Sequence, residues 1–154
     1  MRPQEGTEFW IEWIKAELLV GRSVQLIARG WSMFPTLWRG AQLKLTYTPF
    51  ENLENGNLIA FNRANKAIMH RIVKIEQNAS GRRIQTQGDS NLKPDEWIDE
   101  NQYLGKVIAI NQNEAHQAIS AHKLIAHQRN FMLKHFLLFA ASPYRLARRF
   151  LKSF

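Results

Sequence analysis

The sequence predicts a mainly β protein: a small, partly closed antiparallel β-domain between an N-terminal helix and a C-terminal helical segment. Three observations lead to this fold class. Apolar residues recur at helical spacing over residues 1–22, six short alternating runs follow within residues 23–113, and a helical period returns over residues 114–154. With 154 residues, 45% of them hydrophobic, the chain is long enough to bury one proper core.

The first segment predicts one amphipathic helix. Phe9, Trp10, Trp13 and Ile14 lie on one helical face, and the preceding Thr7 is a favourable N-cap residue before an acidic first turn. Charged residues are spread through the apolar positions of this stretch. The segment therefore predicts neither a cleavable signal sequence nor a membrane-spanning helix.

Short alternating runs rich in β-branched and aromatic residues predict the strands of the central domain. Turn residues separate them, most clearly at 54–57 and 78–81. The six runs, in chain order, are VQLIA, QLKLTYT, NLIAFN, AIMHRIVKIEQ, RRIQTQ and YLGKVIAINQ. Strands of this length and number fit a small, mostly antiparallel, partly closed β-fold.

The C-terminal segment combines an apolar run, FMLKHFLLFAA, with a basic end after Pro143. The run is about half the length needed to cross a bilayer. Two interpretations are equally compatible with it: a helix lying in the membrane interface, or a helix that closes the β-core or the groove of a partner. The first interpretation predicts a peripheral membrane protein and the second a cytoplasmic one. The cations that would meet lipid headgroups are Arg145, Arg148, Arg149 and Lys152.

Seven of the eight net positive charges of the chain lie in this tail. Residues 1–114 contain 14 Lys and Arg against 13 Asp and Glu, whereas residues 115–154 contain seven cations and no acid. A cationic tail on a neutral body predicts an anionic membrane surface as partner, and nucleic acid is disfavoured. The chain has no cysteine, and its four tail histidines are not spaced as a metal pair, so no metal or cofactor is expected.

Four residues could carry chemistry: Ser32 in RGWSMFPTL, His70 in AIMHRIV, and Asp89 and Asp95 in QGDSNLKPD. Taken singly, each is more often a turn or strand residue than a catalytic one. Taken together, they supply a nucleophile, a base and an orienting carboxylate. Serine needs a base to remove its proton, histidine suits that task near neutral pH, and a carboxylate holds the imidazole in the required tautomer.

These motifs resemble those of type I signal peptidases. GWSMFPTLWRG is similar to their nucleophile motif, and AIMHRIVKI is similar to the base-bearing strand of the branch that uses histidine instead of lysine. QGDSNLKPD resembles the glycine-aspartate-asparagine-asparagine motif of that branch, and YLGKVIAI its closing strand. The family usually has aspartate after the glycine that ends the nucleophile motif, whereas here Ala41 follows Gly40.

The resemblance implies a mostly β endopeptidase domain and a role for each matching residue. Ser32 would be the nucleophile, His70 the general base, and Asp95 the orienting carboxylate, supported by Asp89. The backbone N–H of Ser32 would form part of the oxyanion hole, and Met33 and Pro35 would contact the substrate. Gly30 stands where some relatives have a second hydroxyl, so no side-chain donor is expected from that position.

The functional prediction is a serine endopeptidase that removes a leader or signal segment after a short uncharged sequence with small residues, as the resemblance implies. A dedicated protease for one small precursor would carry the same motifs. Self-cleavage of the related LexA type is not expected, because the chain has no Ala-Gly dipeptide. The alternative from another class is a degenerate peptidase domain that binds membrane or nucleic acid through its basic tail.

Overall fold

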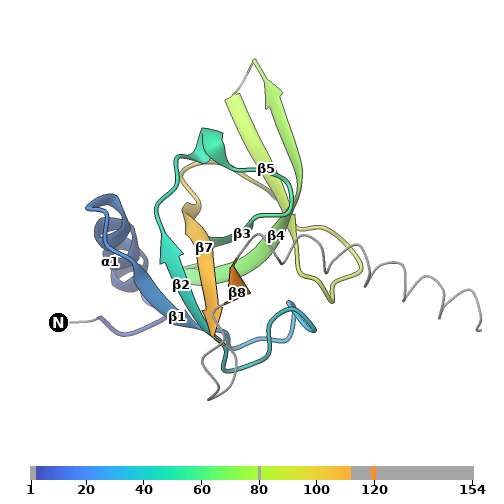
Figure 1. The fold of residues 1–154 in the computed structure, drawn as a ribbon. Coiled ribbons are helices and arrows are strands. Elements are labelled where there is room, and N and C mark those ends of the chain that lie inside the picture. The colour runs from blue at the N-terminus through green and yellow to red at the C-terminus, as the bar shows by residue number, and fades with distance from the viewer. Residues whose placement is uncertain (1–2, 80, 112–118, 121–154) are drawn as a thin grey trace, which may run out of the picture.

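The computed structural model describes residues 3–79 and 81–111, and the backbone of 119–120. Within them the chain is mainly β, with one N-terminal helix and one antiparallel sheet (Figure 1). The helix is α1 (Glu8–Leu19), and a short 3-10 turn covers Phe50–Asn52. The strands are β1 (Val24–Ile27), β2 (Gln42–Thr46), β3 (Leu58–Arg63), β4 (Lys66–Asn78), β5 (Gly81–Gln87), β6 (Trp97–Ile98), β7 (Tyr103–Asn111) and β8 (Ile119–Ser120).

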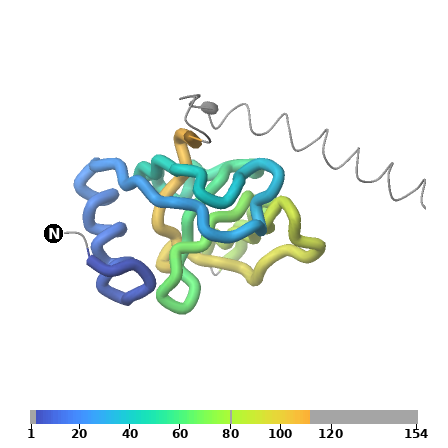
Figure 2. The backbone as a smooth tube through the Cα atoms, turned by 90° about the horizontal axis from the view of Figure 1, so that it is seen from below, coloured from blue at the N-terminus to red at the C-terminus, as the bar shows by residue number. Residues whose placement is uncertain are grey.

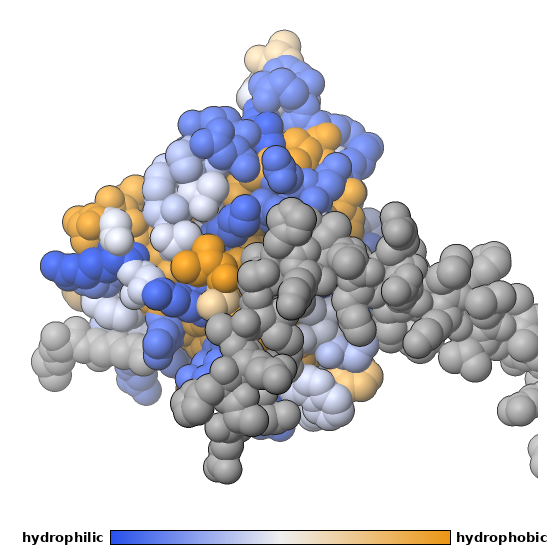
Figure 3. Space-filling view, in the orientation of Figure 1, coloured by the Kyte–Doolittle hydropathy of each residue, from blue (hydrophilic) through white to orange (hydrophobic). Residues whose placement is uncertain are grey.

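The order of strands in the sheet differs from their order in the chain. It runs β1-β2-β7-β3-β4-β5-β6, with β8 paired to β7. Strand β7 therefore lies between β2 and β3, and it pairs antiparallel with both. Strand β4 pairs with β3 over residues 66–71 and with β5 over residues 71–78. The long β4–β5 hairpin extends away from the rest of the domain (Figure 1), and hydrophilic residues cover most of its far end (Figure 3).

Helix α1 packs along the β1–β2–β7 side of the sheet, as Figures 1 and 2 show. Its buried residues are Trp10, Ile11, Ile14 and Leu18. The hydroxyl of Thr7 accepts a hydrogen bond from the backbone N–H of Trp10 and caps the helix. Gly105 of β7 permits the close approach, because a β-carbon there would lie 2.8 Å from Cδ1 of Leu18. The predicted helix and its N-cap are confirmed.

Strand β3 is buried on both faces, and this explains its continuous apolar run, LIAF. Leu58 and Ala60 belong to the core cluster under α1, whereas Ile59 and Phe61 belong to a second cluster formed with β4, β5 and β6. Successive side chains of a strand point to opposite faces. The domain thus has an apolar layer on each side of β3.

The six predicted strands are confirmed, with bounds that differ by one or two residues. Two further strands, β6 and β8, were missed. Ile119–Ser120 lies in the predicted C-terminal helical segment, and the helical prediction is wrong at these two residues, which pair with Ala109 and Ile110 of β7. Arg145, Arg148, Arg149 and Lys152 lie outside the described residues. No helix in the described ranges is long and apolar enough to cross a membrane.

Candidate active site

The candidate nucleophile lies in a loop between β1 and β2 that closes on itself. The N–H of Ala28 donates to the carbonyl of Ala41 at 2.9 Å, and the N–H of Gly40 donates to the carbonyl of Ala28 at 2.7 Å. Met33, Leu37 and Ala41 are buried in the core, so the apolar positions of the loop anchor it. Ala41, where the resembled family carries an acid, thus belongs to this apolar core.

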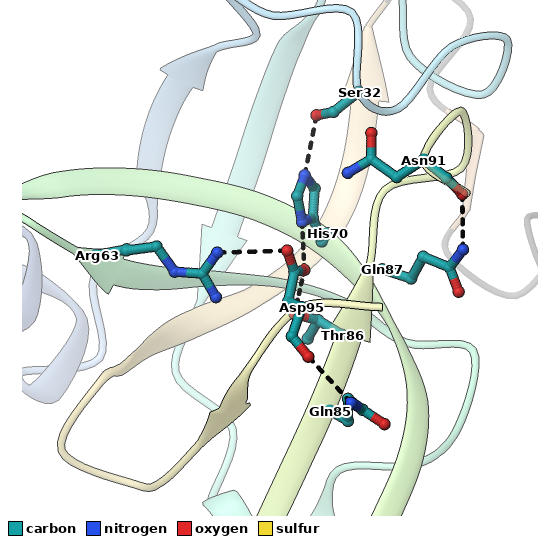
Figure 4. Close-up of polar contacts among 8 residues, drawn as sticks. All are labelled: Ser32, Arg63, His70, Gln85, Thr86, Gln87, Asn91 and Asp95. Atoms are coloured by element: carbon teal, nitrogen blue, oxygen red, sulfur yellow. Dashed lines mark hydrogen bonds and ion pairs between the residues drawn. The ribbon is translucent and has the colours of Figure 1, made fainter. Parts of the chain in front are cut away.

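Ser32, His70 and Asp95 form a continuous hydrogen-bonded chain (Figure 4). The Oγ of Ser32 lies 2.9 Å from Nε2 of His70, and Nδ1 of His70 lies 2.6 Å from Oδ2 of Asp95. Ser32 comes from the β1–β2 loop, His70 from β4, and Asp95 from the segment after β5. The structure thus brings together three residues that are 38 and 25 positions apart.

The direction of each hydrogen bond follows from the charge of Asp95. An ionised carboxylate only accepts hydrogen bonds, so Nδ1 of His70 must carry the proton that it donates to Asp95. The other ring nitrogen, Nε2, is then an acceptor, and the Ser32 hydroxyl donates a hydrogen bond to it. This tautomer is the one that allows histidine to act as a base toward serine.

Strand β5 holds Asp95 in place through both its backbone and its side chain. The N–H of Asp95 donates to the carbonyl of Thr86 at 2.7 Å, and the Thr86 hydroxyl donates to Oδ2 at 2.7 Å. The side chain of Gln85 donates to the carbonyl of Asp95 at 3.0 Å. The other carboxylate oxygen, Oδ1, accepts from Nη1 of Arg63 at 3.3 Å. Asp95 therefore has a partner for each of its oxygens.

The environment of Asp95 lowers its pKa below the ordinary value of 3.8. Burial by itself would raise the pKa, but the hydrogen bonds from His70 and Thr86 and the positive charge of Arg63 outweigh it. Asp95 is therefore ionised throughout the neutral range, and it can accept the hydrogen bond from Nδ1 of His70.

A lowered pKa in the native state means that ionised Asp95 stabilises the fold. This contribution is fully present above about pH 4 and is lost as the pH falls through the lowered value. We expect the free energy of unfolding of wild type minus that of Asp95→Asn to shrink as the pH falls below about 4, where the native carboxylate becomes protonated. Urea unfolding above and below this pH measures it, and a difference undiminished at about pH 3 would contradict the assigned ionisation.

Asp89 does not contact His70. Its two carboxylate oxygens accept from Nε and Nη2 of Arg71, at 2.9 and 2.7 Å. The Arg71 side chain is fully buried, and it also donates to the carbonyl of Gly56 at 3.1 Å. A fourth donation, from Nη2 to the hydroxyl of Thr36, is 3.5 Å long. His70 and Arg71 are neighbours on β4. One strand therefore supplies both the candidate base and the buried arginine that binds Asp89 and holds its loop.

The turn that contains Asp89 is attached directly to the nucleophile loop. The N–H of Ser90 donates to the carbonyl of Ser32 at 2.9 Å, and the Ser90 hydroxyl donates to the carbonyl of Trp31 at 3.0 Å. Gly88 permits this contact. A β-carbon there would lie 2.6 Å from the carbonyl oxygen of Ser32 and 2.8 Å from Nδ2 of Asn91.

We expect Gly88→Ala to displace the nucleophile loop. A shift of about 1 Å at a reacting group can cost on the order of 100-fold in rate, and we expect a loss of this size in kcat for the peptidase activity that the sequence resemblance implies. The matched control is Leu92→Ala in the same segment, because the Leu92 side chain is 98% exposed. Kinetics on folded protein, verified by thermal unfolding, measure the effect. Full activity of Gly88→Ala would show that the nucleophile tolerates a shift of this loop.

A cavity of about 610 Å³ opens beside the three residues. Ser32, His70 and Asp95 line it together with residues of β1, the first half of β4 and the N-terminal segment. Met33 is buried and lines the cavity, whereas Pro35 is not among its lining residues. On the nucleophile loop, the side chains of Trp31, Phe34 and Trp38 are exposed, and Phe34 contacts each tryptophan edge to face.

Three residues with a role in the geometry were not predicted: Arg63, Thr86 and Arg71. The position of Arg71 beside His70 in AIMHRIV was visible in the sequence, but its pairing with Asp89 depends on where the β5–β6 connection folds back. Thr86 is completely buried in β5 and has no sequence feature that distinguishes it from an ordinary strand threonine. Arg63, at the end of β3, likewise gave no signal.

Comparisons with known proteins add no assignment to this geometry. The sequence was compared with protein-family models and with curated proteins, and neither comparison finds a match.

Proposed function

We propose that this chain is a serine endopeptidase that removes a leader or signal segment from a precursor, with a fold and mechanism similar to those of histidine-type signal peptidases. One observation carries the proposal: Ser32, His70 and Asp95 form an unbroken hydrogen-bonded chain on the wall of a cavity. Both oxygens of the carboxylate are also held by partners outside the chain of three. This arrangement is the one that activates a serine hydroxyl.

The proposed reaction proceeds through an acyl-enzyme. Oγ of Ser32 attacks the peptide carbonyl carbon while Nε2 of His70 accepts the hydroxyl proton, and ionised Asp95 stabilises the resulting imidazolium. His70 then donates that proton to the leaving amine as the peptide C–N bond breaks. Water, deprotonated by the same nitrogen, attacks the ester carbon, and His70 returns the proton to Oγ of Ser32 as the C–Oγ bond breaks and the acid product leaves. The backbone N–H of Ser32 stabilises the oxyanion in both steps.

Among the described strands, two lack a second neighbouring strand beside the cavity, and this makes the cavity suitable for an extended peptide. Strand β1 is at the end of the strand order, and residues 66–70 of β4 pair with β3 on one side, while β5 begins its pairing only at Arg71. Unpaired strand edges offer backbone hydrogen bonds to an added strand. The cavity walls include Leu26, Ala28 and Met69, which favour small or apolar side chains near the scissile bond.

We further propose that the enzyme works at a membrane surface. Trp31, Phe34 and Trp38 are exposed beside the nucleophile, and tryptophan is enriched at membrane–water interfaces. The cationic residues after position 114 would add attraction to anionic lipid. Salt-sensitive binding to anionic liposomes, compared between the full chain and a chain without residues 128–154, tests the contribution of the tail.

The experiment that tests the function compares the small secreted and peptide fractions of host strains by mass spectrometry. One strain carries Ser32→Ala, and the matched control carries Ser23→Ala, which replaces an exposed serine before β1. A precursor that accumulates uncleaved only with Ser32→Ala supports the peptidase and identifies the bond. No difference between the strains would favour a non-catalytic domain that acts through its basic tail.

A further inference from the structure

The candidate oxyanion hole has one available backbone donor, the N–H of Ser32. Among the described residues, the backbone N–H of Ser32 donates no hydrogen bond, although its carbonyl accepts one from Ser90. Stabilising a tetrahedral oxyanion takes donors aimed at the position where the charge develops, and enzymes commonly supply two or more. Gly30, two residues before the nucleophile, has no side chain to provide a second donor.

Asn91 is held beside this position by hydrogen bonds that do not involve its side-chain amide. Its N–H donates to the carbonyl of Gly88 at 2.9 Å, and its carbonyl accepts from Nε2 of Gln87 at 2.6 Å. The adjacent Ser90 attaches the same turn to the backbone of Ser32. Because a β-carbon on Gly88 would contact both the Ser32 carbonyl and Nδ2 of Asn91, these two groups face each other across the absent side chain of Gly88.

The side-chain amide of Asn91 is also directed toward the candidate reaction centre. Figure 4 shows it pointing toward Ser32 and His70, and Asn91 lines the cavity with them. Within the part of the chain that the structure describes, this amide makes no hydrogen bond. It is therefore a donor held at the site by its backbone and available to a bound molecule.

We propose that Nδ2 of Asn91 is the second oxyanion donor and a catalytic residue of this site. The inference rests on the proposed endopeptidase function. The amide would donate to the oxygen of the tetrahedral intermediate from the Asp89 turn, while the N–H of Ser32 donates from the nucleophile loop. The Ser90–Ser32 link and the absence of a side chain at Gly88 set the distance between the two donors.

The test uses Asn91→Leu, which keeps the approximate size of the side chain and removes the donor. A peptide library from a trypsin digest of whole-cell protein serves as substrate, and kinetics are measured on one cleaved peptide and on inhibition by its C-terminal aldehyde. We expect kcat to fall about 100-fold with little change in KM, because an oxyanion donor acts on the transition state. Inhibition by the aldehyde, which forms a tetrahedral adduct on serine, should weaken by a similar factor. Leu92→Ala is the control.

A rescue variant separates donation from a structural role. A β-carbon at Gly30 would have the backbone nitrogen of Ser32, at 4.0 Å, as its nearest neighbour, so a serine fits there. We expect kcat of the double variant Gly30→Ser/Asn91→Leu to be at least about tenfold higher than kcat of Asn91→Leu, because the serine supplies a hydroxyl donor. Unchanged kcat in Asn91→Leu, or lost kcat with unchanged aldehyde inhibition, overturns the role of Asn91. A wild-type protein that cleaves no peptide of the library, together with no accumulated precursor in the Ser32→Ala strain, instead overturns the proposed function itself.

Discussion

His70→Ala is expected to lower the rate of cleavage at saturating substrate by about 10⁴-fold or more while the protein stays folded. Loss of one member of a serine triad costs several orders of magnitude, because the serine hydroxyl then has no base. The fold should survive because Asp95 keeps its hydrogen bonds from Thr86 and Arg63 when the imidazole is removed. Single-turnover kinetics on the precursor that wild type cleaves measure the loss of rate, and thermal unfolding measures the stability of the variant.

Ser32→Ala is the matched comparison for His70→Ala. Residues that act as one unit are not additive, so the double variant Ser32→Ala/His70→Ala should be about as slow as either single variant. Substantial activity in folded His70→Ala would rule out His70 as the base. A double variant much slower than both single variants would show that the two residues act independently.

Substitutions of the two aspartates are expected to have different effects. Asp95→Asn should lower kcat by about 10⁴-fold, because a neutral amide no longer selects the tautomer of His70 that accepts the serine proton. Asp89→Asn should instead destabilise the fold by about 3–5 kcal/mol, because it leaves the completely buried charge of Arg71 without its carboxylate. Urea unfolding and kcat measured on the same two variants give both comparisons.

A second variant identifies the unpaired charge as the cause of instability. Arg71→Met/Asp89→Asn removes the charge together with its partner, so it should recover part of the stability that Asp89→Asn loses. If Asp89→Asn proves the slower enzyme and Asp95→Asn the less stable fold, the two carboxylates exchange the roles assigned to them here.

Much of the fold was predictable because local patterns determine it. Helix α1 has its N-cap threonine and its apolar stripe, and six strands have alternating or continuous apolar runs between turn residues. Strands β6 and β8 have only two residues each, too few for any periodicity. Ile119 and Ser120 also lie in a helical pattern, and their pairing with β7 overrides it. Short pairings of this kind depend on a neighbouring strand rather than on their own sequence.

The residue types of the site were predictable, but their contacts were not. Ser32, His70 and Asp95 were recognised as a nucleophile, a base and a carboxylate, and sequence alone left two aspartates available for the third role. Asp89 and Asp95 lie six positions apart in the segment after β5. In this segment the chain turns back beside Thr86, so Asp95 and not Asp89 reaches the imidazole of His70. Arg63 and Arg71 were missed because their partners lie 32 and 18 positions away.

The place of β7 in the sheet determines when this site can form during synthesis. Ser32 belongs to the β1–β2 part of the sheet, whereas His70 and Asp95 belong to the part made by β3, β4 and β5. Strands β2 and β3 do not pair with each other, and β7 joins the two parts. A nascent chain that ends at residue 102 therefore contains Ser32, His70 and Asp95 but lacks the strand that pairs with both parts of the sheet. We expect the three residues to assemble stably only after residues 103–111 have been added, so the proposed peptidase would be inactive before the domain is complete.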